Sequence, residues 1–186
     1  MAKRHDIIWL ETVDSTNEEA KRHISTLDNL SVLSVSYQTQ GKGQRSNRWL
    51  SEPGCNLLIS IVMKPSEIWG KSCLEAKDQF TVSRITVESV VELLGCHDIE
   101  ARIKLPNDIY VGDDKICGIL IENGIKGNLL EYSIIGIGLN VNQTTFDTAL
   151  PNPVSMSSIT GRTYDLSCLL DRFMDIFIHK AVISLS

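Results

Sequence analysis

The longest apolar run in this sequence, Leu57–Met63, restricts the fold more than any other segment, because Ser60 is its only polar residue. A run of this length is far too short to span a bilayer, which takes about 20 apolar residues in a helix. It is typical of a β-strand buried inside a sheet. We therefore expect a buried strand over residues 56–63, in a sheet that other elements cover.

The rest of the chain carries further strand patterns and a few helix patterns. Apolar residues at helical spacing predict helices over residues 16–27, 78–95 and 165–182, the first opened by an N-cap at Asp14 or Ser15. Strand patterns cover residues 7–10, 32–37, 99–104, 108–111, 115–122 and 131–142, with a hairpin turn at residues 112–114. This order predicts an α+β fold with a mixed, largely antiparallel sheet backed by helices. Residues 1–186 are expected to form one domain.

Charge and cysteine usage disfavour several classes of protein. The formal net charge of −5 argues against a general nucleic-acid binder, whose phosphate contacts need a basic surface. The five cysteines are scattered without a CxxC pair and the four histidines lie far apart, so no metal-binding cage is expected. The first residues are charged but lack the apolar segment of a secretory signal, which predicts a cytoplasmic protein without a membrane partner.

The most informative segment is the basic loop (residues 41–49), which reads Gly-Lys-Gly-Gln-Arg-Ser-Asn-Arg-Trp. Glycine lets backbone N–H groups approach a phosphate, and Lys42, Arg45 and Arg48 supply positive charge. Trp49 can lie over a bound ligand and exclude water. The composition alone is equally compatible with a solvated basic loop that a tryptophan anchors.

A second segment, Lys104-Leu105-Pro106-Asn107-Asp108, interrupts a strand with proline, which forces the residue before it into an extended conformation. A lysine there could neutralise a carboxylate and a phosphate that meet in a transition state. Taken alone, a turn with a surface lysine is the more common explanation of such a segment.

Two further segments are informative only together with these. Gly136-Ile137-Gly138-Leu139-Asn140 ends an apolar strand, where small residues let a ligand approach, although a β-bulge or tight packing explains the pattern as well. Ser15-Thr16-Asn17 opens the first predicted helix, where amides and hydroxyls could hold a small polar group or serve only as a helix cap.

These segments, in this order and together with Lys115-Ile116-Cys117-Gly118-Ile119-Leu120-Ile121-Glu122, resemble the biotin–protein ligase family over about residues 8 to 160. The resemblance implies a fold related to class II aminoacyl-tRNA synthetases and a reaction in two steps. The biotin carboxylate attacks the α-phosphate of ATP, and the lysine of a biotin carboxyl carrier protein or domain then attacks the biotinyl-5′-AMP. It implies biotin and ATP as ligands, Mg²⁺ carried by ATP with no metal held by protein side chains, and a monomer or homodimer.

The resemblance also implies roles for particular residues. The biotin site would take Ser15, Thr16, Asn17, Gln38, Gly41, Trp49 and Gly118. Lys104, Arg45 and Arg48 would be catalytic, with Lys104 beside the reacting carboxylate and α-phosphate. The nucleotide site would take Arg45, Asn107, Gly138 and Asn140, and the acceptor lysine would meet Asp108 and Lys115.

The sequence departs from the family pattern at several places. The basic loop reads Gly-Lys-Gly-Gln where relatives often read Gly-Arg-Gly-Arg, which leaves open which cation contacts the phosphates, and Leu105 replaces a frequent tryptophan. No N-terminal DNA-binding domain is expected, and a C-terminal SH3-like barrel is expected to be absent or truncated. The alternatives are a lipoate–protein ligase, an octanoyltransferase with a nucleophilic cysteine, and a domain that binds biotin or nucleotide without full activity.

Overall fold

The computed structural model describes residues 6–44, 47–70, 74–105 and 107–184. One seven-stranded sheet runs through it in the order β1-β2-β3-β7-β6-β5-β4. The strands are β1 (Ile7–Val13), β2 (Val32–Gln38), β3 (Leu57–Met63), β4 (Arg102–Lys104), β5 (Asp108–Val111), β6 (Asp114–Lys126) and β7 (Leu129–Leu139). The helices are α1 (Thr16–Arg22), α2 (Pro65–Trp69), α3 (Phe80–Gly95), α4 (Met156–Thr160) and α5 (Leu166–Ile183), with a 3₁₀ turn, η3 (Ala76–Asp78).

The sheet is mixed and largely antiparallel, which confirms the predicted fold class. Only β1 and β2 run parallel, and each of the other neighbouring pairs is antiparallel. All residues of β3 are buried, as its unbroken apolar sequence predicts, and β3 lies between β2 and β7 in the middle of the sheet.

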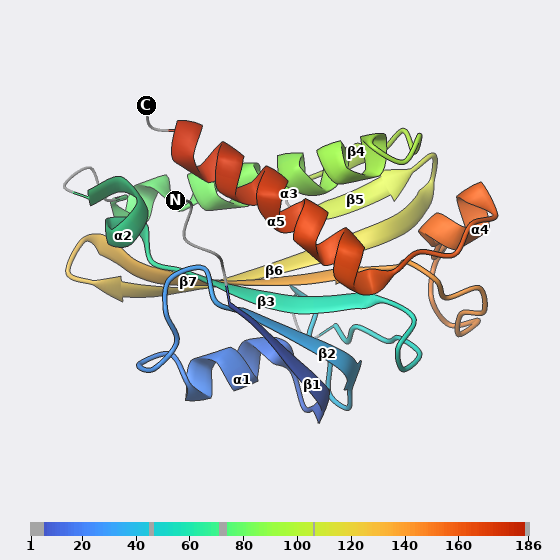
Figure 1. Cartoon of the computed structure of the whole chain (residues 1–186), viewed down its shortest axis with the longest axis horizontal. Coiled ribbons are helices and arrows are strands. Elements are labelled where there is room, and N and C mark those ends of the chain that lie inside the picture. Colours follow the sequence, from blue (N-terminus) through green and yellow to red (C-terminus); the bar gives the residue numbers. More distant parts are fainter. Residues whose placement is uncertain (1–5, 45–46, 71–73, 106, 185–186) are drawn as a thin grey trace.

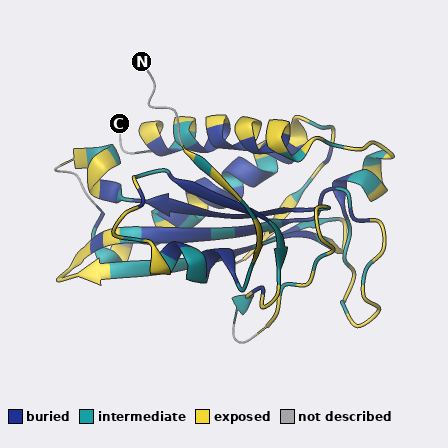
Figure 2. Cartoon of the chain, turned by 60° about the horizontal axis from the view of Figure 1, so that its bottom comes forward, coloured by how far each residue is buried: buried dark blue, intermediate teal, exposed yellow. Residues whose placement is uncertain are grey.

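Helices cover the two faces of the sheet unequally. The long helices α3 and α5 lie together on one face, while α1 lies on the other (Figure 1). Figure 2 shows α5 with its buried side turned toward the sheet and its exposed side turned outward. The larger core fills the space between α3, α5 and the sheet, and its largest side chains include Phe173 and Phe177. A smaller core under α1 contains Ala20, Leu33 and Val62.

The predicted elements differ from the structure mainly at their ends. The first helix is expected to reach residue 27 but ends at Arg22, because the next backbone bonds tighten to an i→i−3 spacing, as in His23 N–H to Ala20 O. Leu27 still packs in the smaller core from the turns that follow. Strands β6 and β7 form one long hairpin, in which Lys126 pairs with Leu129 and Gly127 has a φ of +64°. The predicted hairpin turn lies at Gly112, which has a φ of +58°.

Candidate active site

A floor of glycines lies on the face of the sheet that carries α1. Gly118 of β6 pairs with Gly138 of β7, and Gly136 lies further along β7 on the same face. A Cβ at Gly118 would lie 2.8 Å from the Trp49 ring, and one at Gly138 or Gly136 would collide with the Trp49 ring or the Asn17 amide. These positions, which we call the glycine floor, thus admit two side chains directly onto the strand backbone.

The start of α1 forms one end of the site. Ser15 is the N-cap residue, yet its side chain makes no capping hydrogen bond, and Ser15 lines the cavity of the site. The backbone N–H of Thr16 donates to Gln38 Oε1 over 2.8 Å, and the Thr16 hydroxyl donates to the same oxygen over 3.2 Å. Since that oxygen is occupied, the amide nitrogen of Gln38 is the group left to donate to a ligand.

Asn17 anchors α1 to the sheet. Its Nδ2 donates to Leu120 O over 3.2 Å and to Glu122 Oε2 over 2.8 Å, while its Oδ1 accepts from the Ser60 hydroxyl over 2.6 Å. Asn17 and Ser60 are both buried. The sequence motifs did not single out Ser60, although a lone polar residue in an apolar strand is a signal that a buried partner must exist.

The basic loop folds back on itself as a small hairpin. The Trp49 N–H donates to Gly41 O over 2.9 Å, the Gly43 N–H donates to Asn47 O over 2.8 Å, and Lys42 forms a β-bridge with Arg48. A Cβ at Gly41 would lie 2.5 Å from the Trp49 carbonyl oxygen, so glycine is required where the two arms meet. The predicted residue Arg45 lies outside the described residues.

The second arm of this hairpin places Trp49 on the glycine floor. Its ring lies against Gly118 and Gly138, and the Lys115 ammonium lies 5.7 Å from the ring centroid. The indole Nε1 is buried and has no hydrogen-bond partner among the described residues. Trp49 therefore closes one side of the site at the cost of an unsatisfied donor.

A cavity of about 390 Å³ lies between α1, the glycine floor and the basic loop. It brings together most of the residues that the sequence assigns to a site, namely Ser15, Thr16, Asn17, Gln38, Arg48, Trp49, Asn107, Asp108, Lys115, Gly118 and Gly138. Lys42, Gln44, Leu105 and Gly136 also line it. Gly41, Lys104 and Asn140 do not line this cavity.

The cations around the cavity have different partners. The Arg48 Nη2 donates to Thr39 O over 2.9 Å, and the Lys115 ammonium forms a 2.8 Å ion pair with Asp108. Lys104 lies on the exposed edge strand β4, with its ammonium 4.6 Å from the centroid of the Tyr110 ring. Asp108 and Lys115 are both about one-third exposed, so their pair faces the open side of the site.

A second cavity of about 280 Å³ adjoins the first. Asn47, Arg48, Trp49 and Lys115 line both cavities, and Asn140, Phe146, Leu150, Pro151 and Pro153 line the second together with Leu50. The Asn140 amide donates to Val154 O over 3.0 Å and the Asn107 amide donates to Ile119 O, so both amide donors are engaged by the backbone. Trp49 and Lys115 thus form a wall between two neighbouring spaces.

Cys117 lies next to Gly118 of the glycine floor, where a nucleophilic cysteine would have to be reactive. Cys117 is fully buried, and burial raises the pKa of its thiol, which disfavours the reactive thiolate. In the part of the chain that the structure describes, no His, Cys, Asp and Glu side chains gather in a group that could bind a metal ion. Within the same residues, no helix has the length and apolar character needed to cross a membrane.

A scan against family models matches residues 9–140 to the biotin/lipoate A/B protein ligase family. The chain belongs to this family, which confirms the resemblance that its motifs indicate.

Individual relatives agree with that assignment. The chain is 30% identical over 147 residues to the bifunctional ligase/repressor BirA of Escherichia coli, a match that covers 77% of this chain and 43% of that protein. It is 37% identical over 117 residues to the biotin–protein ligase of Homo sapiens, covering 61% of this chain and 15% of that protein. The biotin protein ligase of Aquifex aeolicus, solved with biotin and ATP, superposes with a TM-score of 0.75 at 26% identity, over 95% of this chain and 70% of that one. The fold is therefore that of the biotin protein ligases, while the chain spans less than half the length of these two curated relatives.

Proposed function

We propose that this chain activates biotin with ATP to biotinyl-5′-AMP and transfers the biotinyl group to a lysine of a biotin carboxyl carrier protein or domain. The observation that carries the proposal is the cavity between α1, the glycine floor and the basic loop. Its lining combines the hydroxyl and amide groups of Ser15, Thr16 and Gln38 with the cations Lys42, Arg48 and Lys115. This arrangement matches a ligand that has a neutral polar head and a carboxylate tail.

In this proposal, the head group of biotin binds at the start of α1. The Ser15 hydroxyl and the amide nitrogen of Gln38 would donate to the ureido oxygen, since Thr16 already occupies the amide oxygen of Gln38. The apolar ring of biotin would pack on the glycine floor beside Trp49, and the indole ring of Trp49 would keep water from the reacting atoms.

The adenylation step follows from where charge develops. One carboxylate oxygen of biotin forms a bond to the α-phosphorus of ATP, and the bond from that phosphorus to the bridging oxygen breaks to release pyrophosphate. Arg48 and Lys115, which line both cavities, would attract the meeting anions, and Lys104 would approach from β4. ATP would occupy the second cavity and bring Mg²⁺ with it, which offsets the charge of the leaving group.

The transfer step needs an amine rather than an enzyme nucleophile. The neutral amine of the acceptor lysine attacks the biotinyl carbonyl carbon, an amide bond forms, and AMP leaves with the former bonding electrons. The Asp108–Lys115 pair lies on the open side of the site, where Asp108 could receive the proton that the amine loses. The acceptor domain, the cytoplasmic location, the single-domain boundaries and the monomeric or dimeric state stay predictions.

The test is a mass-spectrometric assay for adenylate after the chain is mixed with Mg-ATP and either biotin or lipoate. Biotinyl-AMP from the natural chain, sharply reduced in Lys104→Ala, is the expected result. Lipoyl-AMP in its place would assign the chain to the lipoate branch of the family. Binding of biotin without any adenylate would show a binding domain and refute the proposed catalysis.

A further inference from the structure

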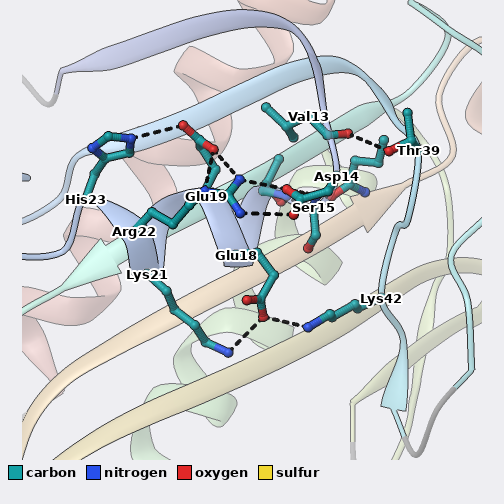
Figure 3. A network of polar contacts seen from close by, with 12 residues as sticks. Val13, Asp14, Ser15, Glu18, Glu19, Lys21, Arg22, His23, Thr39 and Lys42 are labelled. Carbon is teal, nitrogen blue, oxygen red and sulfur yellow. Dashed lines mark hydrogen bonds and ion pairs between the residues drawn. The ribbon is translucent and has the colours of Figure 1, made fainter.

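A glutamate of α1, Glu18, faces the basic loop and has no role in the proposed reaction. Glu18 projects from the first turn of α1, and its Oε1 lies 2.6 Å from the Lys42 ammonium and 3.0 Å from the Lys21 ammonium. Figure 3 shows the Glu18 carboxylate between these two lysines, one from its own helix and one from the basic loop. The contact joins elements that are 24 residues apart in the chain.

The two lysines depend on Glu18 to different degrees. Lys21 has a second carboxylate partner in Glu122, at 2.5 Å, whereas Glu18 is the one carboxylate that pairs with Lys42 among the described residues. Hydrogen bonds from Lys42 first, and then from Lys21, hold the pKa of the Glu18 carboxyl below its usual value, so Glu18 is ionised at neutral pH. Loss of the Glu18 charge would therefore leave Lys21 paired and Lys42 without its ion-pair partner.

Lys42 is coupled through the backbone to the side chain that covers the glycine floor. It forms a β-bridge with Arg48, and the neighbouring Gly41 accepts a hydrogen bond from the Trp49 N–H. A displacement of the Lys42 arm must strain or break these bonds, because the two arms of the hairpin are joined there. The position of Trp49 on the glycine floor thus depends on where Lys42 is held.

We infer that Glu18 is a positioning residue that holds the basic loop over the cavity through Lys42, and that Lys42 serves as an anchor rather than as a ligand of the ATP phosphates. This inference rests on the proposed function for the identity of the ligand, but the anchoring itself concerns the ligand-free chain. It assigns the phosphates to the other cations of the site.

The test is a double-mutant cycle of Glu18→Gln and Lys42→Gln, with Glu19→Gln as the matched control. Glu19 is the next residue of the same helix, but its carboxylate pairs with Arg22 and His23, away from the basic loop (Figure 3). The control therefore removes the same charge from the same turn without touching Lys42.

Amide hydrogen exchange over residues 41–50 is measured by mass spectrometry on the ligand-free proteins. Partly exposed ion pairs of this kind contribute little free energy. Each single variant should therefore raise the exchange rate by about threefold to fivefold. The double variant should exchange no faster than the single ones, and Glu19→Gln should match the natural chain. Raising the salt concentration to about 1 M should bring the natural chain toward Glu18→Gln, because salt screens the pair.

Steady-state kinetics then separates anchoring from phosphate binding. We expect Lys42→Gln and Glu18→Gln to change the kinetics alike: the biotin KM of each should rise by no more than the exchange factor, and the ATP KM of Lys42→Gln should rise no more than that of Glu18→Gln. Equal exchange in Glu18→Gln and Glu19→Gln, or multiplying effects in the double variant, would overturn the inference. A large rise in ATP KM in Lys42→Gln would make Lys42 a phosphate ligand and would also overturn it. If the two substitutions affect exchange non-additively but the chain makes no adenylate, the proposed function is refuted while the anchoring role of Glu18 stands.

Discussion

Replacing Asn17 with alanine tests the most buried part of the site. The substitution removes the acceptor of the Ser60 hydroxyl and the donor to Leu120 O and Glu122, with no room for bulk water at Ser60, whose exposed fraction is 0%. A buried polar group left without a partner costs about 1 to 3 kcal/mol. Glu122 keeps Lys21 as a partner and is partly exposed, so it adds less.

We therefore expect Asn17→Ala to lower the free energy of unfolding by about 2 to 4 kcal/mol, measured by urea denaturation. For a domain of this size, that loss corresponds to a fall in Tm of roughly 4 to 16 °C. The cause is the lost anchor between α1 and the sheet, so the start of α1 should also lose protection in hydrogen exchange.

The control is the same substitution in a Ser60→Ala background, where the hydroxyl that Asn17 satisfies is already gone. The double variant should lose less stability than the sum of the two single losses, by at least about 0.5 kcal/mol, because residues in contact are energetically coupled. A loss below about 1 kcal/mol for Asn17→Ala, or strict additivity with Ser60→Ala, would refute the anchoring role.

Three further outcomes follow from the site. Gly138→Ala should force the Trp49 ring off the glycine floor and weaken biotin binding at least about tenfold in calorimetry, while unchanged affinity would show that the ring does not need that position. Lys104→Ala should lower the rate of adenylate formation by about 100-fold or more, since unit charges about 4 Å apart interact by roughly 4 kcal/mol at an effective dielectric near 20. The stability that Glu18 contributes should be complete above its usual pKa and disappear as the pH falls through its lowered folded-state pKa. The difference in unfolding free energy between the natural chain and Glu18→Gln should accordingly vanish at acid pH, and a difference that persists there would contradict the assigned cause.

The sequence predicts the strands, the helices α1, α3 and α5 and much of the cavity wall because these depend on local patterns, whereas the five-residue helices α2 and α4 are too short to show a helical period. An unbroken apolar strand has to be buried, and Leu57–Met63 is buried throughout. Helical spacing finds α3 and α5, whose apolar faces cover one side of the sheet. The motif residues at the start of α1 and in the basic loop come together because the family pattern already contains their spatial relation.

The sequence does not predict contacts between residues far apart in the chain. Nothing local links Ser60 to Asn17, which are 43 residues apart, or Lys42 to Glu18. The sequence also does not predict where the Lys104 side chain lies. The motif assigns it to the centre of the chemistry, whereas the structure places it on the exposed edge strand β4. Side-chain position at such a site depends on the bound ligand as well as on the chain.

The site has a rigid part and an adjustable part, which differ in how fully their polar side-chain atoms are hydrogen-bonded. At the α1 end, both polar atoms of Asn17 have protein partners, so any movement there breaks buried hydrogen bonds. At the hairpin end, the Trp49 Nε1 is buried without a partner among the described residues, and the basic loop is held from α1 by the partly exposed pair of Lys42 and Glu18. Moving Trp49 therefore costs less than moving Asn17. A ligand with a fixed polar head and a reacting tail needs this asymmetry, because the head must be recognised in one place while the cover over the tail opens and closes.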